Sequence, residues 1–252
     1  MISNFKNILF SLEEFALIIR DLASGILTLK DNMDETLNEM YLIGSKALPL
    51  VFLGGLFTGV ILAIETGHQL KIFGATSLIS RTVSLGMVRE LGPVVTGLLL
   101  AARTGAKNSS EIGAMKLSDQ IDALIAFGLN PVNKLVLPRT VAALIMFLPL
   151  TLIADITGIL GGMLIANQTF QIDLALFWNT AIDALKMKDL FVGFTKPFFF
   201  GFFISTISCY FGLRTKGGTS GLGKNTINAV VYSSITILIL DFIFTKIVWE
   251  LL

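Results

Sequence analysis

Residues 86–139 read GMVRELGPVVTGLLLAARTGAKNSSEIGAMKLSDQIDALIAFGLNPVNKLVLPR, and the rest of the chain is organised around them. The first part is apolar but contains the adjacent charged pair Arg89 and Glu90. A polar segment follows, and apolar sequence resumes after Pro138 and Arg139. The charged side chains of the polar segment are Arg103, Lys107, Glu111, Lys116, Asp119, Asp122 and Lys134. This order predicts two membrane spans joined by a segment that a soluble partner can move.

Composition extends the prediction to the whole chain. Of its 252 residues, 54% are hydrophobic and only 15% are charged, whereas soluble domains carry roughly 25% charge. The apolar residues fall in long blocks, which predicts an all-α integral membrane protein. A net charge of +1 argues against a nucleic-acid partner. The single cysteine, Cys209, cannot form an internal disulfide and is expected to be a core residue.

The first 41 residues are expected to form an amphipathic helix and a link rather than a span. Apolar residues recur every three or four positions between Phe5 and Leu22, with charged residues among them. Such a helix either lies in the membrane interface or packs on a soluble face of its own protein, and the small soluble mass favours the interface. Asp31–Glu39 is expected to be a link or a second short helix. Met1–Phe10 does not have the pattern of a cleavable signal peptide.

Residues 42–252 are predicted to form one domain with five spans. The spans are long apolar segments with polar ends, at about residues 43–64, 82–102, 135–166, 190–213 and 227–249. Between them, Phe73-Gly74-Ala75 is expected to turn, Asn167–Lys188 to be amphipathic and lie at an interface, and Arg214–Asn225 to be a flexible loop. Residues 55–59 and 158–162 both read GxxxG, and such small-residue strips allow close helix contact.

Lys and Arg residues predict the orientation. They concentrate in the N-terminal region, in 103–139 and in 214–224, which lie on one side if the five spans alternate. The positive-inside rule makes that side cytoplasmic. The N-terminus is therefore expected inside and the C-terminus outside.

Signals for catalysis are weak. His68 is the only histidine, and no HExxH, GxSxG or CxxC motif occurs. Residues 218–225, GTSGLGKN, fit GxxxxGK, but Asn225 stands where a P-loop has Ser or Thr and spans flank the motif. We interpret this motif as a flexible turn. The chain is expected to be a non-catalytic subunit with no metal and no cofactor of its own.

The pair Arg89 and Glu90 is more informative. Charged residues inside a span cost about 3 kcal/mol each on insertion scales, so they face a protein interior or a water-filled cavity. Adjacent residues point about 100° apart on a helix, so these two need not pair with each other. Gly92-Pro93 is expected to bend the helix there. Two interpretations stay open: a polar element beside a cavity or subunit interface, and an ion pair that locks helices.

The polar segment also suggests how a partner could act on the chain. The spacing from Asp122-Ala123 to Gly128 resembles the EAA-type loop of ABC importer permeases, in which a short helix docks into a groove on the ATPase. The distance from Gly128 to Leu137-Pro138 is shorter here. A short amphipathic helix bounded by Gly128 and Pro131 could transmit a rigid-body push. A solvated loop is the alternative.

Longer motifs resemble those of the MlaE/YrbE permeases of Mce-associated lipid ABC transporters. They include RELGP at 89–93, ARTG at 102–105, EIGAMK at 111–116, DQIDAL at 119–124 and GLNP at 128–131. Further matches are Pro138-Arg139, Asp189-Leu190, Lys196, Cys209-Tyr210, 217–218, 221–223 and Asp241. The similarity covers roughly residues 57–246. Departures from the usual pattern are Asp119 in place of Glu, Lys224 in place of Arg, and Pro197 in place of Ser.

The resemblance implies a homodimeric permease of a bacterial-type inner membrane, with five spans, an interfacial N-terminal helix and a short cytoplasmic coupling helix in each subunit. It implies cytoplasmic ATPase subunits that bind ATP and dock near Asp122–Pro131. It also implies a hexameric Mce-domain protein on the periplasmic side and a small STAS-type accessory protein. The substrate would be a phospholipid or related lipid, in a pocket at the dimer interface, with a role in outer-membrane lipid asymmetry.

Two sets of site residues follow from the resemblance. The lipid pocket or its rim is expected to include Leu62, Gln69, Leu70, Phe73, Arg89, Glu90 and Leu91. ATPase coupling is expected to use Asp122, Ala123, Leu124, Phe127, Gly128 and Pro131. Apolar members of the first set would contact acyl chains, and polar members would stabilise the headgroup side or the interface.

Three other functions are alternatives to this one. An ion-coupled secondary transporter would use Arg89, Glu90 and Asp155 as intramembrane charges. A membrane-embedded enzyme of lipid metabolism would need a nucleophile or metal constellation, and the sequence offers none. A purely structural anchor for an outer-facing partner would not need the charges inside the span. Neither the direction of transport nor the headgroup preference follows from the sequence.

Overall fold

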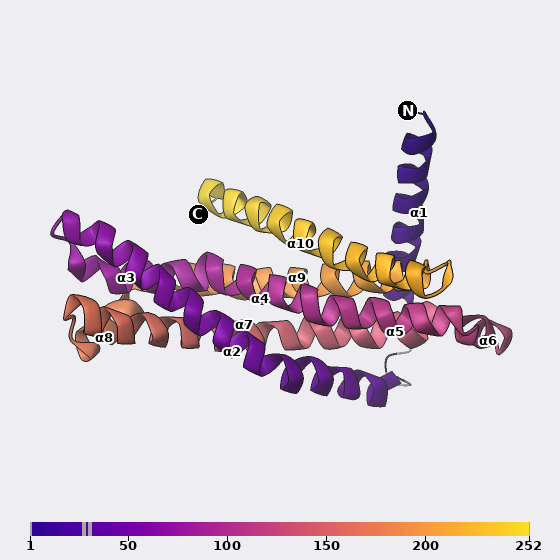
Figure 1. Cartoon of the computed structure of the whole chain (residues 1–252), viewed down its shortest axis with the longest axis horizontal. Coiled ribbons are helices and arrows are strands. Elements are labelled where there is room, and N and C mark those ends of the chain that lie inside the picture. Colours follow the sequence, from indigo (N-terminus) through magenta and orange to yellow (C-terminus); the bar gives the residue numbers. More distant parts are fainter. Residues whose placement is uncertain (1, 27–28, 30–31, 252) are drawn as a thin grey trace. The chain divides into compact units, whose positions relative to one another are not determined.

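The computed structural model describes residues 2–26, 29 and 32–251, and these residues contain helices and no strand (Figure 1). The α-helices are α1 (Ile2–Gly25), α2 (Met33–Ile72), α3 (Ile79–Gly86), α4 (Gly92–Leu100), α5 (Ala106–Leu117), α6 (Gln120–Ala126), α7 (Leu137–Phe170), α8 (Leu174–Ala184), α9 (Met187–Leu213) and α10 (Gly218–Leu251). Between them lie a 3-10 turn, η2 (Thr76–Leu78), and three π-helical segments, η3 (Met87–Leu91), η4 (Ala101–Gly105) and η5 (Val132–Val136).

The predicted five spans are confirmed in number and order. Five helical segments of the described chain are long and apolar enough to cross a membrane. They are Met33–Ile72, Thr76–Leu117, Val132–Phe170, Met187–Leu213 and Gly218–Val248. The chain is therefore an all-α integral membrane protein, as its long apolar blocks predicted.

Helices continue into polar sequence at three places, and two expectations are wrong for this reason. The link or separate short helix expected at Asp31–Glu39 is the start of α2 from Met33 onward, and Asp31 lies outside the described residues. The helix of the second predicted span continues beyond Ala102 through η4 and α5 to Leu117, while the end of the membrane span itself stays a prediction. The loop expected at Arg214–Asn225 is limited to four residues, because α10 begins at Gly218. Polar residues end an apolar run, but they do not end a helix when their side chains find partners.

Helix α1 is confirmed over most of the amphipathic N-terminal stretch. Its second half packs on other helices through Leu22, which is buried, and Phe15, whose ring meets that of Tyr210 edge-on at 5.7 Å. Glu14 pairs with Arg214 at 3.3 Å. Side chains of residues 1–12, including Phe5, lie outside the described part. The location of α1 in a membrane interface stays a prediction.

The chain divides into two compact units, each with its own core. Unit 1 comprises Met1–Ile43, Leu100–Leu144 and Gly201–Thr236, and unit 2 comprises Gly44–Leu99, Ile145–Phe200 and Ile237–Leu252. The core of unit 1 consists of Leu22, Ile112, Ile121, Val132, Leu135, Val136, Leu137 and Cys209. The core of unit 2 consists of Ala63, Ile79, Val83, Met87, Val88, Ile159, Ala166, Phe177 and Ala181. Cys209 is therefore a core residue, as expected.

Within unit 2, the two predicted GxxxG strips meet each other. A Cβ added at Gly55 or Gly59 of α2 would overlap backbone atoms of Ala154 or Gly158 of α7. Only glycine lets the two backbones come this close. The strips thus serve packing inside one chain.

Turns between the helices rely on residues that tolerate positive φ. The predicted turn at Phe73–Ala75 is confirmed: α2 ends at Ile72, and Gly74 has φ of +68°. Asp119 (φ +57°) starts α6, and Gly128 (φ +76°) follows its end. A short helix between the second and third spans is therefore confirmed.

Helix α8 begins with an N-cap. The side chain of Asp173, the N-cap residue, accepts a hydrogen bond from the amide of Leu176.

Candidate functional site

Unit 2 contains a cavity of about 620 Å³ with both charged and apolar walls. Its lining residues come from η2, α3 and η3, with one from α10: Leu78, Arg81, Thr82, Leu85, Gly86, Arg89, Glu90 and Thr245. A wall that combines guanidinium groups, a carboxylate and leucine side chains suits a molecule with a polar and an apolar end.

Beside this cavity, five charged side chains form two linked clusters. Arg89 donates from Nε to Asp189 Oδ1 at 2.6 Å, and its terminal nitrogen reaches the same oxygen. Lys196 is fully buried, and its Nζ contacts Glu90 Oε2 at 2.6 Å and Asp241 Oδ1 at 2.8 Å. Two cations thus face three carboxylates. A buried ammonium held this way requires its partners, since a charge left alone in an apolar interior is very costly.

The local backbone explains how Arg89 and Glu90 reach different partners. Both lie in the π-helical segment η3, which ends immediately before Gly92 and Pro93. In a regular α-helix, the residue at position 93 would donate its amide hydrogen to the carbonyl of Arg89. Pro93 has no amide hydrogen, so this bond is missing. Lys196 Nζ instead donates to that carbonyl at 2.8 Å. Arg89 and Glu90 therefore contact different partners and do not pair with each other, and the bend expected at Gly92-Pro93 stays a prediction.

The residues predicted for the lipid pocket do not all gather at this cavity. Arg89 and Glu90 line it. Three others, Leu62, Leu70 and Leu91, pack against the core of unit 2. The remaining two are exposed: Gln69 donates to Glu65 at 2.9 Å, and Phe73 lies at the turn after α2. A lipid-binding role for these five stays a prediction.

Sequence reasoning assigned no role to several residues that complete the site. Lys196 and Asp241 are charged residues inside predicted spans, and the cost of burying them was the signal that could have identified them. Asp189 precedes the fourth predicted span and carried no such signal. Arg81 and Thr245 are recognisable only from their place in the cavity wall.

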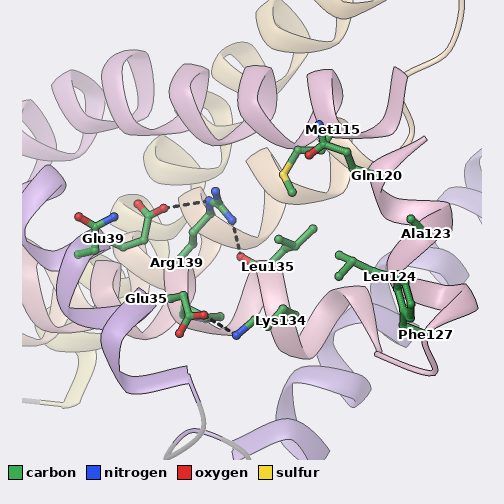
Figure 2. A pocket seen from close by; sticks show the side chains of 12 residues that line it. Glu35, Glu39, Met115, Gln120, Ala123, Leu124, Phe127, Lys134, Leu135 and Arg139 are labelled. Atoms are coloured by element: carbon green, nitrogen blue, oxygen red, sulfur yellow. Dashed lines mark hydrogen bonds and ion pairs between the residues drawn. The ribbon is translucent and has the colours of Figure 1, made fainter. Parts of the chain in front are cut away.

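Unit 1 contains a second cavity, of about 540 Å³, beside α6 (Figure 2). Its walls come from the start of α2, the end of α5, α6 and the segment from η5 into α7. The lining residues are Glu35, Asn38, Glu39, Met115, Gln120, Ala123, Leu124, Phe127, Lys134, Leu135, Pro138 and Arg139. Figure 2 shows Leu124 directed toward Leu135, whose cluster it packs against.

Ion pairs hold the walls of this second cavity together. Glu39 of α2 pairs with Lys107 of α5 at 2.7 Å and with Arg139 of α7 at 3.3 Å. Arg139 also contacts Glu111 of α5 at 3.1 Å and donates to the carbonyl of Leu135 at 2.8 Å. A further pair, between Glu35 and Lys134, is drawn in Figure 2. The starts of α2 and α7 and helix α5 are thereby tied to one another.

The residues predicted for coupling lie on α6 or shortly after its C-terminal end. Ala123, Leu124 and Phe127 line the cavity of unit 1, and the ring of Phe127 is 82% exposed. Asp122 is exposed and pairs with Lys116 at 2.7 Å. Gly128 ends the helix in a left-handed conformation, and Pro131 precedes η5. An exposed aromatic and an exposed carboxylate on one short helix form a suitable contact surface for a protein partner.

The other residues that the sequence singled out lie in separate surroundings. His68 Nδ1 lies 2.8 Å from the carbonyl of Ile64, and its ring meets Phe170 edge-on. Among the described residues, no group of three His, Cys, Asp or Glu side chains could hold a metal ion. The GxxxxGK motif opens α10, so it is not the flexible turn that we expected, although Gly217 and Gly218 have positive φ. Asp155 lines a separate cavity.

Comparison with known proteins places the chain in one family. Residues 36–247 match the family described as Permease MlaE. A probable ABC transporter permease protein of Rickettsia conorii is 36% identical over 241 residues, which are 96% of this chain and 91% of that protein. A probable ABC transporter permease protein of Synechocystis sp. is 32% identical over 219 residues, which are 87% of this chain and 83% of that protein.

A plant relative is also similar. Protein TRIGALACTOSYLDIACYLGLYCEROL 1, chloroplastic, of Arabidopsis thaliana is 32% identical over 221 residues. The match covers 88% of this chain and 63% of the plant protein.

Proposed function

The chain belongs to the MlaE permease family of ABC transporters, and from this premise we propose that it carries a phospholipid or related lipid across or out of the membrane. A separate ATPase subunit supplies the energy, and the permease contributes the lipid site and the surface that the ATPase pushes. ATP, the only cofactor involved, is bound by that partner.

The cavity of unit 2 carries the proposal for a lipid substrate. Leu78 and Leu85 supply apolar wall, while Arg81, Arg89 and Glu90 supply charge. A phosphate group matches a guanidinium, and acyl chains match leucine side chains. The plant relative is named after a galactolipid, which also favours a lipid substrate.

Filling the cavity tests this assignment. Leu85→Trp adds bulk to the cavity wall without changing its charge. We expect it to raise the Kd for phospholipid about tenfold, which corresponds to a loss of about 1.4 kcal/mol of binding free energy. Native mass spectrometry of the detergent-purified protein measures the bound lipid. Leu164→Trp is the control, because Leu164 is exposed on α7 of unit 2 and does not line the cavity. Equal lipid retention by both variants would count against the cavity as the lipid site.

The ATPase would act on α6. The exposed side chains of Asp122 on α6 and of Phe127 just after it would form the contact. The ion pairs of Glu39, Lys107 and Arg139 would transmit the movement to α2, α5 and α7. A nucleotide-dependent push requires that the ATPase bind two permease conformations with different affinity.

Charge reversal at Asp122 and strain at Gly128 test the coupling. Asp122→Lys places a second cation beside Lys116. Gly128→Ala puts a side chain at a position where φ is +76°, which strains the backbone. We expect both variants to insert normally but to lose ATP-driven lipid transport by about tenfold or more, the effect of 1.4 kcal/mol or more of lost coupling. Vesicles reconstituted with the ATPase measure hydrolysis and lipid movement together.

Matched controls separate coupling from folding. Asp183→Lys reverses an exposed charge on α8, and Gly74→Ala imposes the same backbone strain at a turn far along the sequence from α6. Both controls should transport normally. Normal transport by Asp122→Lys and Gly128→Ala would show that the coupling assignment is wrong.

The remaining partners and the location complete the proposal. We propose a homodimer in a bacterial-type inner membrane, with the N-terminus and α6 cytoplasmic and the C-terminus periplasmic. An Mce-domain protein on the periplasmic side would exchange lipid with the permease, and a STAS-type protein would accompany the ATPase. Copurification from detergent, with mass spectrometry of protein and lipid, tests these partners together.

A further inference from the structure

Asp155 of α7 is a buried carboxyl group with an unused hydrogen-bonding atom. The residue is 4% exposed, and its Oδ1 has no hydrogen-bond partner among the described residues. By contrast, Lys196 and Asp189 in the same unit have close partners of opposite charge. Leaving a buried polar group unsatisfied costs about 1–3 kcal/mol. A native structure that accepts this cost has a reason for it.

Asp155 lies in the wall of a cavity of about 190 Å³, and the other lining residues are apolar. Val88, Ile159 and Ala181 are buried members of that wall. Ile156, Trp178, Ile182 and Phe194 are between 38% and 53% exposed. The cavity therefore borders an apolar surface of unit 2 and holds one carboxyl group.

The backbone next to Asp155 makes room for its carboxyl group. A Cβ added at Gly92 would overlap Oδ1 of Asp155, so glycine at this position lets the carboxyl group stay where it is. Gly92 directly follows the π-helical segment η3, and such segments are frequent at functional sites. The carboxyl group thus lies close to the backbone of Gly92, with no hydrogen bond to its Oδ1.

We propose that this cavity binds the hydroxyl-bearing end of an uncharged lipid. The apolar surface of a membrane protein borders lipid, so a ligand enters from the lipid phase. A dry apolar cavity of about 150 Å³ can hold a benzene-sized group, so there is room for a hydroxyl group and the first carbons of a chain. A phosphate group would find no cation among the lining residues.

A hydroxyl group also fits the chemistry of Asp155 in either protonation state. It donates to a carboxylate and accepts from a protonated carboxyl group. An alkyl chain without a hydroxyl group offers the carboxyl group no hydrogen bond. This site is separate from the proposed transport site, because the two cavities share no lining residue.

Tryptophan fluorescence can test the proposal directly. The chain has two tryptophans, Trp178 and Trp249, so Trp249→Phe leaves Trp178 in the cavity wall as the only one. The probes are 2-bromo-1-decanol, whose bromine lies next to its hydroxyl group, and 1-bromodecane, and in both probes the bromine quenches a nearby indole. We expect saturable quenching by the alcohol, with half-saturation at least tenfold lower than for the alkane.

Substitutions at Asp155 identify the group that recognises the hydroxyl. Asp155→Leu should remove the preference for the alcohol, while Asp155→Asn, which can still donate and accept, should keep most of it. Thr151→Val is the control: Thr151 is buried one turn earlier on α7, bonds the carbonyl of Phe147 at 2.9 Å, and does not line the cavity. Its half-saturation should be unchanged.

Two results would overturn the proposal. One is quenching of Trp178 by the alkane as strongly as by the alcohol, and the other is an Asp155→Leu protein that still prefers the alcohol. Circular dichroism and size-exclusion chromatography check the fold of each variant. If Asp155→Leu does not fold, the comparison of the two probes in the Trp249→Phe protein still decides. Failure here would leave the phospholipid result with Leu85→Trp untouched.

Discussion

Replacing Lys196 with Met is expected to destabilise unit 2 by about 3–5 kcal/mol, the cost of removing one partner from a buried ion pair. The ammonium group is fully buried and serves Glu90, Asp241, the carbonyl of Arg89 and the hydroxyl of Thr245. Methionine has a similar length but no charge and no donor. Since Glu90 is 36% exposed, solvent can relieve part of the loss, so the lower end of the range is expected.

Heating the detergent-purified protein and measuring the fraction that stays monodisperse gives the apparent melting temperature. Lys196→Met should lower it clearly. Adding Glu90→Gln and Asp241→Asn should restore part of the loss, because the stranded carboxylates are then neutral. Lys246→Met is the matched control, since its pair with Glu250 is exposed and such pairs contribute about 0–1 kcal/mol. Equal melting temperatures for Lys196→Met and Lys246→Met would refute a stabilising role for the buried cluster.

Much of the fold was predictable from the sequence because a membrane span has a simple physical signature. Long apolar blocks gave the five spans, and Gly74 gave a turn. The ends of the helices were not predictable in the same way. Helix α2 extends back to Met33 because Glu39 is neutralised by Lys107 and Arg139, which are distant in sequence. Hydropathy along the chain carries no information about such partners.

The candidate site, like the fold, was predictable only in part. The cost of placing Arg89 and Glu90 in a span showed that they need partners, and the structure provides Asp189 and Lys196, 100 and 106 residues away. The residues alone did not predict that Asp189 and Lys196 would be the partners of Arg89 and Glu90. Gln69 and Phe73 illustrate the opposite case, because their expected role came from resemblance and they lie outside the cavity wall.

The structure also bears on the ion-coupled alternative. That mechanism would use Arg89, Glu90 and Asp155 as intramembrane charges. Arg89 and Glu90 are instead engaged by Asp189 and Lys196, and Asp155 lines a different cavity. The three residues are thus not assembled into one ion site, and family membership favours a transporter driven by ATP.

Replacing Gly59 with Ala is expected to destabilise the protein by roughly 1–3 kcal/mol or more, the usual range for overpacking. The new methyl group would overlap the carbonyl of Gly158, which belongs to the backbone of α7 and cannot move alone. Helices α2 and α7 would have to separate along their contact. The alanine itself favours a helix over glycine by about 1 kcal/mol, so the observed loss is what remains after that gain.

The same substitution at two other glycines isolates the role of the contact. Gly223 of α10 has nothing within 4 Å of an added Cβ, so Gly223→Ala should stabilise by up to about 1 kcal/mol through helix propensity alone. Gly54 of α2 faces the flexible end of Leu99, so Gly54→Ala should be close to neutral. The apparent melting temperatures should therefore rank Gly223→Ala above Gly54→Ala and both above Gly59→Ala. Because the chemical change is identical at the three sites, helix propensity cannot produce this ranking, and an unchanged melting temperature for Gly59→Ala would mean that α2 and α7 are not in backbone contact.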